Sequence, residues 1–178
     1  MYIPKYTINT EILRNIGAVE AAKEVIENAP LVPAWEAKFK DDATLRAAHY
    51  GTVLEGNDLT LNEAKAILDN GLEVASQAAE KGIMARERDV QEVINYRNVL
   101  KFLEQNQAPG DYSVDLLLQM HKLVVDKVVA EDAAGKFREK QVILRNSVTG
   151  EVGFRPPKAW EVPQLVSDFM VWLNNYGL

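Results

Sequence analysis

Few side chains in this sequence could carry out chemistry. It has two histidines, His49 and His121, and no cysteine. The absence of cysteine excludes a thiolate nucleophile, a disulfide framework and a Cys-ligated metal. The sequence also has no glycine-rich phosphate loop, no His-Glu-x-x-His, no Gly-x-Ser-x-Gly and no carboxylate cluster with metal spacing. We therefore interpret His121 as a core or boundary histidine and His49 as a packing or capping residue, and the residues alone indicate no catalytic group and no metal ligand.

The segment from His49 to Asn57 departs from ordinary helix design at two positions. Gly51 lies inside an expected helix, where glycine costs about 1 kcal/mol relative to alanine. Glu55 lies in the expected last turn, where the helix dipole favours cations over acids. Two interpretations are open. In the first, Gly51 allows close helix packing and Glu55 is an ordinary surface residue. In the second, Glu55 pairs with a cation, an arginine, from another part of the structure.

A second candidate site is an expected β-hairpin near the C-terminal end. Residues Gln141 to Leu144 are rich in β-branched side chains, residues 146–150 form a turn signal, and Val152 to Phe154 can return. An exposed ribbon has unpaired edge groups, so it could bind an extended peptide by strand addition. The alternative is that the segment only connects two helices.

Composition limits the class of protein. The 178 residues carry 26 acidic against 20 basic side chains, a net charge of −6. This balance argues against a general nucleic-acid binder. No apolar run reaches the ~18 residues of a membrane span, and the first residues show no secretory signal. We expect one soluble, cytoplasmic domain over residues 1–178.

The candidate sites are carried by segments of mostly helical periodicity. The spacing of apolar residues and caps predicts a mostly α-helical bundle with one β-hairpin before the last helix. The segment from 113 to about 129 is apolar on nearly all sides, so we expect it to be the central, most buried helix. The expected helices cover about residues 10–28, 41–55, 60–70, 72–81, 87–105, 113–129 and 160–176.

Four stretches, in this order, carry a family resemblance. They are Thr52-Val53-Leu54-Glu55-Gly56-Asn57 followed by Leu59-Thr60-Leu61; Val90 to Leu100 with Asn95-Tyr96; Leu117 to Lys122 with His121; and Gly135-Lys136-Phe137-Arg138 with Val142-Ile143 and Phe154-Arg155-Pro156-Pro157. The ordered set resembles the Fic (filamentation induced by cyclic AMP) family of AMP-transferring proteins. The resemblance spans nearly the whole chain.

The resemblance implies a Fic-like helical fold whose hairpin is a flap, and an activity that transfers AMP from ATP, with Mg²⁺, to a protein hydroxyl. It assigns an autoinhibitory helix motif to Thr52, Glu55, Gly56 and Asn57. Glu55 would pair with an arginine that otherwise holds the ATP γ-phosphate. The flap would hold a protein target by strand pairing through Gln141, Val142, Ile143, Leu144, Gly153 and Phe154.

The sequence departs from the family pattern at two places. The family has Ser or Thr four residues before the inhibitory glutamate, where this chain has Gly51. The family's catalytic loop, His-x-Phe followed by an acidic metal ligand, Gly-Asn-Gly-Arg and a second Arg, does not occur in the 178 residues. We therefore expect the N-terminal and flap portion of a Fic-like domain, with no catalytic residue, weak ATP and Mg²⁺ binding and no activity of its own. Its parts would be residues 1–57 with the inhibitory helix, a helical core at 58–134, the flap at 135–157 and a helix at 158–178.

A hypothesis of a different class is also open. The chain could be a non-catalytic helical domain that binds or regulates a protein partner through the hairpin edge or the Glu55 face. In both cases we expect a protein partner, no nucleic acid and no membrane. The segment at 116–129 is apolar on nearly all sides, so each side needs a neighbour that covers it. Where this chain does not supply one, a second copy would, so we also expect a homo-oligomer.

Overall fold

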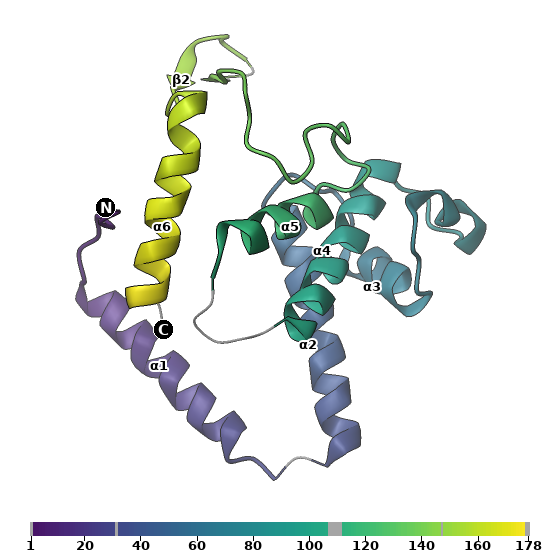
Figure 1. Ribbon diagram of the computed structural model, residues 1–178. Helices are drawn as coiled ribbons and strands as arrows, with labels where there is room; N and C mark the ends of the chain where they lie inside the picture. Colours follow the sequence, from purple (N-terminus) through teal and green to yellow (C-terminus); the bar gives the residue numbers. More distant parts are fainter. Residues whose placement is uncertain (1, 31, 107–111, 147, 177–178) are drawn as a thin grey trace. The chain divides into compact units, whose positions relative to one another are not determined.

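The computed structural model describes residues 2–30, 32–106, 112–146 and 148–176 (Figure 1). Over these residues the chain is mostly helical, with one two-stranded antiparallel hairpin before the last helix, so the predicted fold class is confirmed. The α-helices are α1 (Thr10–Glu27), α2 (Pro33–Val53), α3 (Leu61–Asp69), α4 (Glu87–Gln105), α5 (Val114–Val124) and α6 (Val162–Tyr176). The short 3₁₀ helices are η1 (Ala75–Gln77), η2 (Ala79–Lys81) and η3 (Ala159–Glu161), and the strands are β1 (Leu144–Arg145) and β2 (Val152–Phe154).

The chain divides into two compact units. The smaller unit, Ile3–Ala43, contains α1 and the first part of α2, and α1 has no buried residue. The larger unit, Met1–Tyr2 with Thr44–Leu178, contains the end of α2 and everything that follows. Both candidate sites therefore belong to the larger unit.

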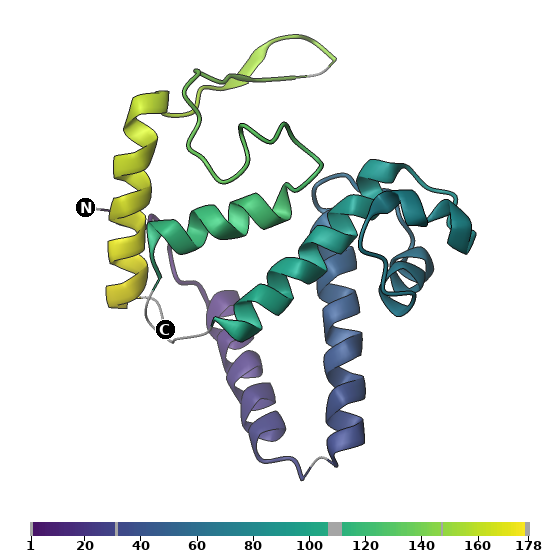
Figure 2. The ribbon, with the colours of Figure 1, turned by 45° about the vertical axis from the view of Figure 1, so that its right-hand side comes forward.

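The apolar core of the larger unit is built around α4. Its most deeply buried large side chains are Ile67 of α3 and Val90, Val93 and Ile94 of α4. Helix α4 lies between α3 and α5 (Figure 2), and the α4 side chain Asn95 donates to the carbonyls of Val124 and Asp126 at the end of α5. This helix, predicted over residues 87–105, is confirmed at those bounds.

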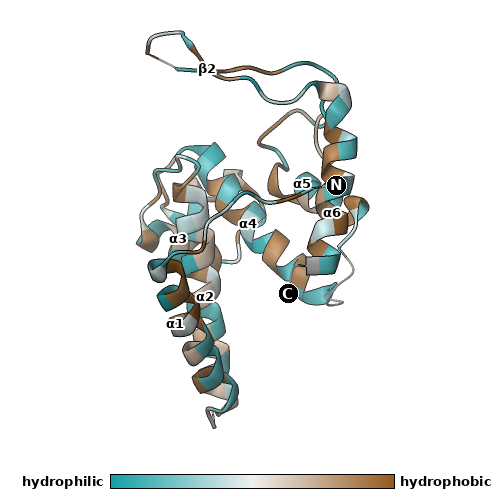
Figure 3. Cartoon of the chain, turned by 90° about the vertical axis from the view of Figure 1, so that its left-hand side faces the viewer, coloured by the Kyte–Doolittle hydropathy of each residue, from teal (hydrophilic) through white to brown (hydrophobic). Residues whose placement is uncertain are grey.

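Helix α5 is not the most buried helix, and that prediction was wrong. None of its residues is fully buried, and Val124 is 39% exposed. The physical reason is that α5 packs on α4 and α6, while the rest of its apolar circumference stays partly exposed. Figure 3 shows the hydrophobic residues of α5 and α6 in brown.

Local signals set most of the other boundaries. Helix α3 begins with a capping box, in which the Thr60 hydroxyl accepts from the Glu63 amide and the Glu63 carboxylate accepts from the Thr60 amide. Three expected boundaries were wrong. Helix α5, expected to run to about 129, ends at Val124. Helix α2 begins at Pro33 instead of 41, since proline at a first helical position loses no hydrogen bond. Residues 72–81 form η1 and η2, not one α-helix.

The start of the larger unit is attached to α6 by aromatic contacts. The Tyr2 ring lies edge-on to Phe169 and Trp172, with centroids 5.2 and 5.3 Å apart. Phe169 and Trp172 stack at 5.7 Å.

Among the described helices, none is long and apolar enough to cross a bilayer.

Candidate functional site

Glu55 lies in a tight turn directly after α2. The turn is closed by the Gly56 amide, which donates to Val53 O at 3.0 Å, and by the Asn57 amide, which donates to Thr52 O at 3.2 Å. Gly56 has a φ of +89°, the left-handed conformation expected of a helix-ending glycine. Glu55 is therefore the second residue past the helix, and not in its last turn as expected. Its side chain is exposed, and within the described residues it has no ion pair or hydrogen bond.

The residues around Glu55 are held by buried hydrogen bonds. The Thr52 hydroxyl donates to Ala48 O at 2.9 Å and to His49 O at 3.1 Å, inside its own helix. Asn57 is also buried and reaches α4: its Nδ2 donates to Asp89 O and to Glu92 Oε2, both at 3.0 Å. Thr52 and Asn57 thus fix the backbone of the turn and leave the Glu55 carboxylate exposed and able to meet an outside cation.

An ion-pair cluster holds the other side of the same turn. The Arg86 guanidinium lies 2.8 Å from Asp89 and 2.8 Å from Asp58, the residue after Asn57. The hydrogen bond and charge of Asp89, followed by the charge of Asp58, raise the pKa of Arg86. The start of α4 and the turn are therefore joined twice, by the hydrogen bonds of Asn57 and by the ion pair between Arg86 and Asp58.

Gly51 is explained by close packing against α4. A Cβ atom at Gly51 would lie 2.5 Å from Cε2, 2.8 Å from Cζ and 2.9 Å from the hydroxyl oxygen of Tyr96. The Tyr96 ring therefore occupies the space that any larger side chain at position 51 would need. This supports the packing interpretation of Gly51 and accounts for the departure from the Ser or Thr of the family motif.

The contacts found for the two histidines in the described part of the chain are with neighbouring backbone or aromatic groups. The Nδ1 of His121 accepts from the Gly135 amide at 2.9 Å, which ties the loop after α5 back to that helix. The His49 ring lies 4.9 Å from the Tyr50 ring, and its Nδ1 is buried without a hydrogen bond to the described residues. These placements support the packing interpretation.

The hairpin contains the six predicted flap residues in one exposed ribbon. Leu144 pairs with Phe154 and Arg145 with Val152, with an irregularity between the two pairs. The expected first strand, Gln141 to Leu144, was wrong in position, because β1 begins only at Leu144. The register places Gln141 and Val142 opposite Pro157 and Pro156, and proline has no amide hydrogen to pair.

Side chains close the base of the hairpin where backbone pairing stops. Gln141 Nε2 donates to Pro156 O at 3.2 Å and to Pro157 O at 3.4 Å. The Arg138 guanidinium also donates to Pro157 O. The described strands β1 and β2 pair only with each other, so both edges of the ribbon are open.

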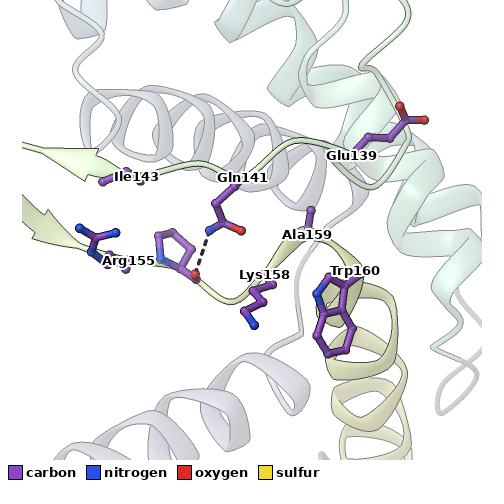
Figure 4. A pocket seen from close by; sticks show the side chains of 8 residues that line it. Glu139, Gln141, Ile143, Arg155, Lys158, Ala159 and Trp160 are labelled. Carbon is purple, nitrogen blue, oxygen red and sulfur yellow. Dashed lines mark hydrogen bonds between the residues drawn. The ribbon is translucent and has the colours of Figure 1, made fainter.

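An open cleft of about 590 Å³ lies at the base of the hairpin (Figure 4). Gln141, Ile143 and Arg155 line one part of it, and Lys158 and Trp160 line another, with the Lys158 ammonium 5.7 Å from the centre of the Trp160 ring. Sequence reasoning missed Arg155, Lys158 and Trp160 as site residues. The basic side chains flanking the predicted strands were the signal that could have indicated them.

The described residues offer no ready-made cluster of metal ligands. They contain no group of three or more His, Asp or Glu side chains placed to hold a metal ion. No step through ATP or Mg²⁺ is therefore assigned to these residues.

The sequence is similar to those of two protein adenylyltransferases. It is 29% identical over 130 residues to the protein adenylyltransferase fic-1 of Caenorhabditis briggsae, and 28% identical over 130 residues to fic-1 of Caenorhabditis elegans. Each match covers 71% of this chain, which spans only 22% of the length of each relative. No known family model matches the sequence.

The fold is similar to that of a solved protein structure. A Fic family protein from Desulfovibrio desulfuricans G20 superposes with a TM-score of 0.71 at 23% sequence identity. The match covers 99% of this chain and 49% of that chain. The helices and the hairpin therefore occur together, in this order, in a known fold.

Proposed function

We propose, on the premise that this chain is a Fic-family protein, as its sequence similarity and fold support, that it takes part in the transfer of AMP from ATP to a protein hydroxyl. The observation that carries the proposal is the similarity to two protein adenylyltransferases over 130 residues, which covers 71% of the chain. Within that reaction, these residues regulate the transfer and hold the target.

The regulatory part is Glu55. Its carboxylate is exposed on a turn whose backbone is held by Thr52, Gly56 and Asn57, so the place from which this side chain reaches a partner is set in advance. A carboxylate presented in this way can take an arginine through two parallel hydrogen bonds. An arginine engaged by Glu55 is not available to a phosphate, so the contact inhibits the transfer.

The target-holding part is the hairpin. Its open edges can pair with the backbone of an extended segment, which would hold the accepting hydroxyl in a fixed register. Gln141, Val142, Ile143 and Leu144 form one arm, and Gly153 and Phe154 lie in the other.

The chemical step needs groups that these 178 residues do not contain. The sequence has no His-x-Phe and no Gly-Asn-Gly-Arg, which in the family supply the base and the phosphate contacts. We therefore expect the purified 178-residue chain to transfer no label from ATP to any target. Transfer by the chain itself would contradict this expectation.

The role of Glu55 is tested in a chain in which these residues are followed by the His-x-Phe motif. Because Glu55 would withhold an arginine from the phosphate, Glu55→Gly and Glu55→Gln should both raise label transfer from ATP, by about tenfold or more. Glu80→Gln, which removes an exposed carboxylate from η2, should change nothing. Equal activity of all four proteins would exclude the inhibitory role.

A second function is a non-catalytic protein-interaction or regulatory domain. It is favoured by the exposed apolar side chains of the hairpin, among them Leu144 and Phe154 at 59% and 58% exposure. In that case hairpin substitutions would abolish partner binding, and Glu55→Gln would leave every activity unchanged.

A further inference from the structure

The hairpin segment has the opposite charge balance to the rest of the chain. Residues 135–161 contain six basic and three acidic side chains, whereas the whole chain carries a net charge of −6. None of the six basic side chains forms an ion pair with a carboxylate of the described residues. The basic residues are Lys136, Arg138, Lys140, Arg145, Arg155 and Lys158.

Two of the three acids in this segment are already engaged. Glu161 accepts from the Lys158 amide at 2.6 Å, and Glu151 accepts from the Thr149 hydroxyl at 3.3 Å. The third, Glu139, lines the cleft, but in Figure 4 its carboxylate points away from Arg155 and Lys158. None of these three carboxylates forms an ion pair with a basic side chain of the described part of the segment, so Arg155 and Lys158 are left to bind an outside anion.

The cleft continues one face of the ribbon. Leu144 pairs with Phe154, so the same register places Ile143 opposite Arg155, and alternate residues share a face. Gln141 and Ile143 of one arm and Arg155 of the other accordingly line the same cleft, with Lys158 and Trp160 at its far side. An extended peptide added along residues 141–143 would project every second side chain toward these groups.

We infer that the hairpin selects an extended peptide segment carrying acidic side chains, which Arg155 and Lys158 bind, with an apolar side chain between Ile143 and Trp160. This inference rests on the proposed target-holding role of the hairpin and adds the chemical class of the target. Backbone pairing alone accepts any sequence, whereas the two unpaired cations discriminate by charge.

The test uses the intact 178-residue chain and three fluorescein-labelled nonapeptides. Each alternates valine with a polar residue around a central threonine, and the polar residue is glutamate, glutamine or lysine. By fluorescence anisotropy, the glutamate peptide should bind about tenfold more tightly than the glutamine peptide, since each exposed charge pair contributes about two- to fivefold. The lysine peptide should bind most weakly, and about 0.5 M NaCl should remove the preference.

Matched variants assign the preference to the cleft. Arg155→Gln combined with Lys158→Gln should weaken the glutamate peptide about tenfold, to the level of the glutamine peptide, and leave the glutamine peptide unchanged. Glu139→Gln should strengthen binding of the glutamate peptide about two- to threefold, a gain that misfolding cannot produce. Lys101→Gln, at an exposed position on α4, is the control and should have no effect.

The outcomes separate this inference from the proposed function. Equal binding of the glutamate and glutamine peptides would overturn the charge selection and leave strand binding intact. A glutamate preference that survives the Arg155 and Lys158 substitutions would also overturn it, as would tighter binding of single-stranded oligothymidylate than of any peptide. Binding of none of the peptides would overturn the target-holding role of the hairpin and this inference with it.

Discussion

At the scale of single residues, the contact between Gly51 and Tyr96 determines how the Glu55 turn meets α4. The ring lies where a side chain at position 51 would begin, so α2 and α4 approach closely four residues before Glu55. Tyr96 packs on the apolar core, which holds the ring in place. The position of Glu55 thus depends on a glycine that touches no ligand.

Gly51→Ala should destabilise the chain by about 1–3 kcal/mol, because the added methyl overlaps a ring that cannot move freely. Urea unfolding followed by circular dichroism measures the loss. The matched control is Gly17→Ala in α1, where a Cβ meets nothing within 4 Å. This change should stabilise its own helix by about 0.5–1 kcal/mol.

Tyr96 is tested as the cause in a double-mutant cycle. In a Tyr96→Ala background the alanine at position 51 has room, so its cost should disappear. The same loss of stability in both backgrounds would contradict the steric explanation.

Sequence reasoning at this scale succeeded where the signal is local. Thr60 and Glu63 are three residues apart, and Gly56 follows directly after a helical pattern, so their capping roles could be predicted. The contacts of Gly51 with Tyr96 and of Arg138 with Pro157 join residues distant in sequence. No local pattern specifies which partner a folded chain brings to each of them.

At the scale of secondary-structure elements, α3 depends on its capping box. The Thr60 hydroxyl and amide both donate to Glu63, and these two hydrogen bonds lower the pKa of that carboxyl below 4.5. A carboxyl whose pKa is lower in the folded state stabilises the fold above its unfolded pKa. That stabilisation is lost as the pH falls through the folded value.

Glu63→Gln should therefore cost stability at pH 7, and the difference from the parent chain should shrink as the pH falls through the lowered pKa of Glu63 in the folded state. Urea unfolding at several pH values measures this. Thr60→Ala, which removes the hydroxyl partner, should cost about 1 kcal/mol at pH 7. A Glu63→Gln deficit that grows on acidification would contradict the sign.

The base of the hairpin depends on side chains where prolines prevent backbone pairing. Arg138→Ala removes the charged donor to Pro157 O, so the ribbon should open more often. Amide exchange should become about tenfold faster at the paired residues nearest the base, Leu144 and Phe154, with little change in global unfolding. Arg145→Ala removes a contact at the tip, to Gly150 O, and should leave the base closed.

The remaining errors at the element scale have a common origin. The existence of the helices and of the hairpin follows from periodicity and turn residues, and it was predicted. The burial of α5 and the late start of β1 depend on which neighbours these elements have, and a single-sequence pattern does not contain that information. The same holds for the cleft residues Arg155, Lys158 and Trp160, which lie outside the strands.

At the scale of the whole molecule, apolar surface remains uncovered on the larger unit. No residue of α5 is fully buried, and Leu165 and Val171 of α6 are 48% and 53% exposed. Apolar surface gathered over two contacting helices is typical of an interface between proteins. This supports the expectation of a homo-oligomer.

Sedimentation velocity over a range of concentrations should show a dimer or a larger assembly. Leu165→Glu combined with Val171→Glu should shift it toward monomer by about tenfold in dissociation constant, because a buried interface would have to desolvate two charges. Gln119→Glu, at an exposed position of α5, is the control for added negative charge. A parent chain that stays monomeric at high concentration would exclude self-association.

Pro156 and Pro157 also affect how the ribbon behaves toward copies of itself. Open strand edges are templates for sheet growth, and a stack of strands can lengthen only if both edges of each unit accept a neighbour. Below Arg155 the returning arm offers no amide hydrogen at two successive residues, which leaves only the three residues of β2 for pairing. The arm at 141–143 can thus recruit a strand, while the shortened opposite edge protects the protein from fibrous aggregation.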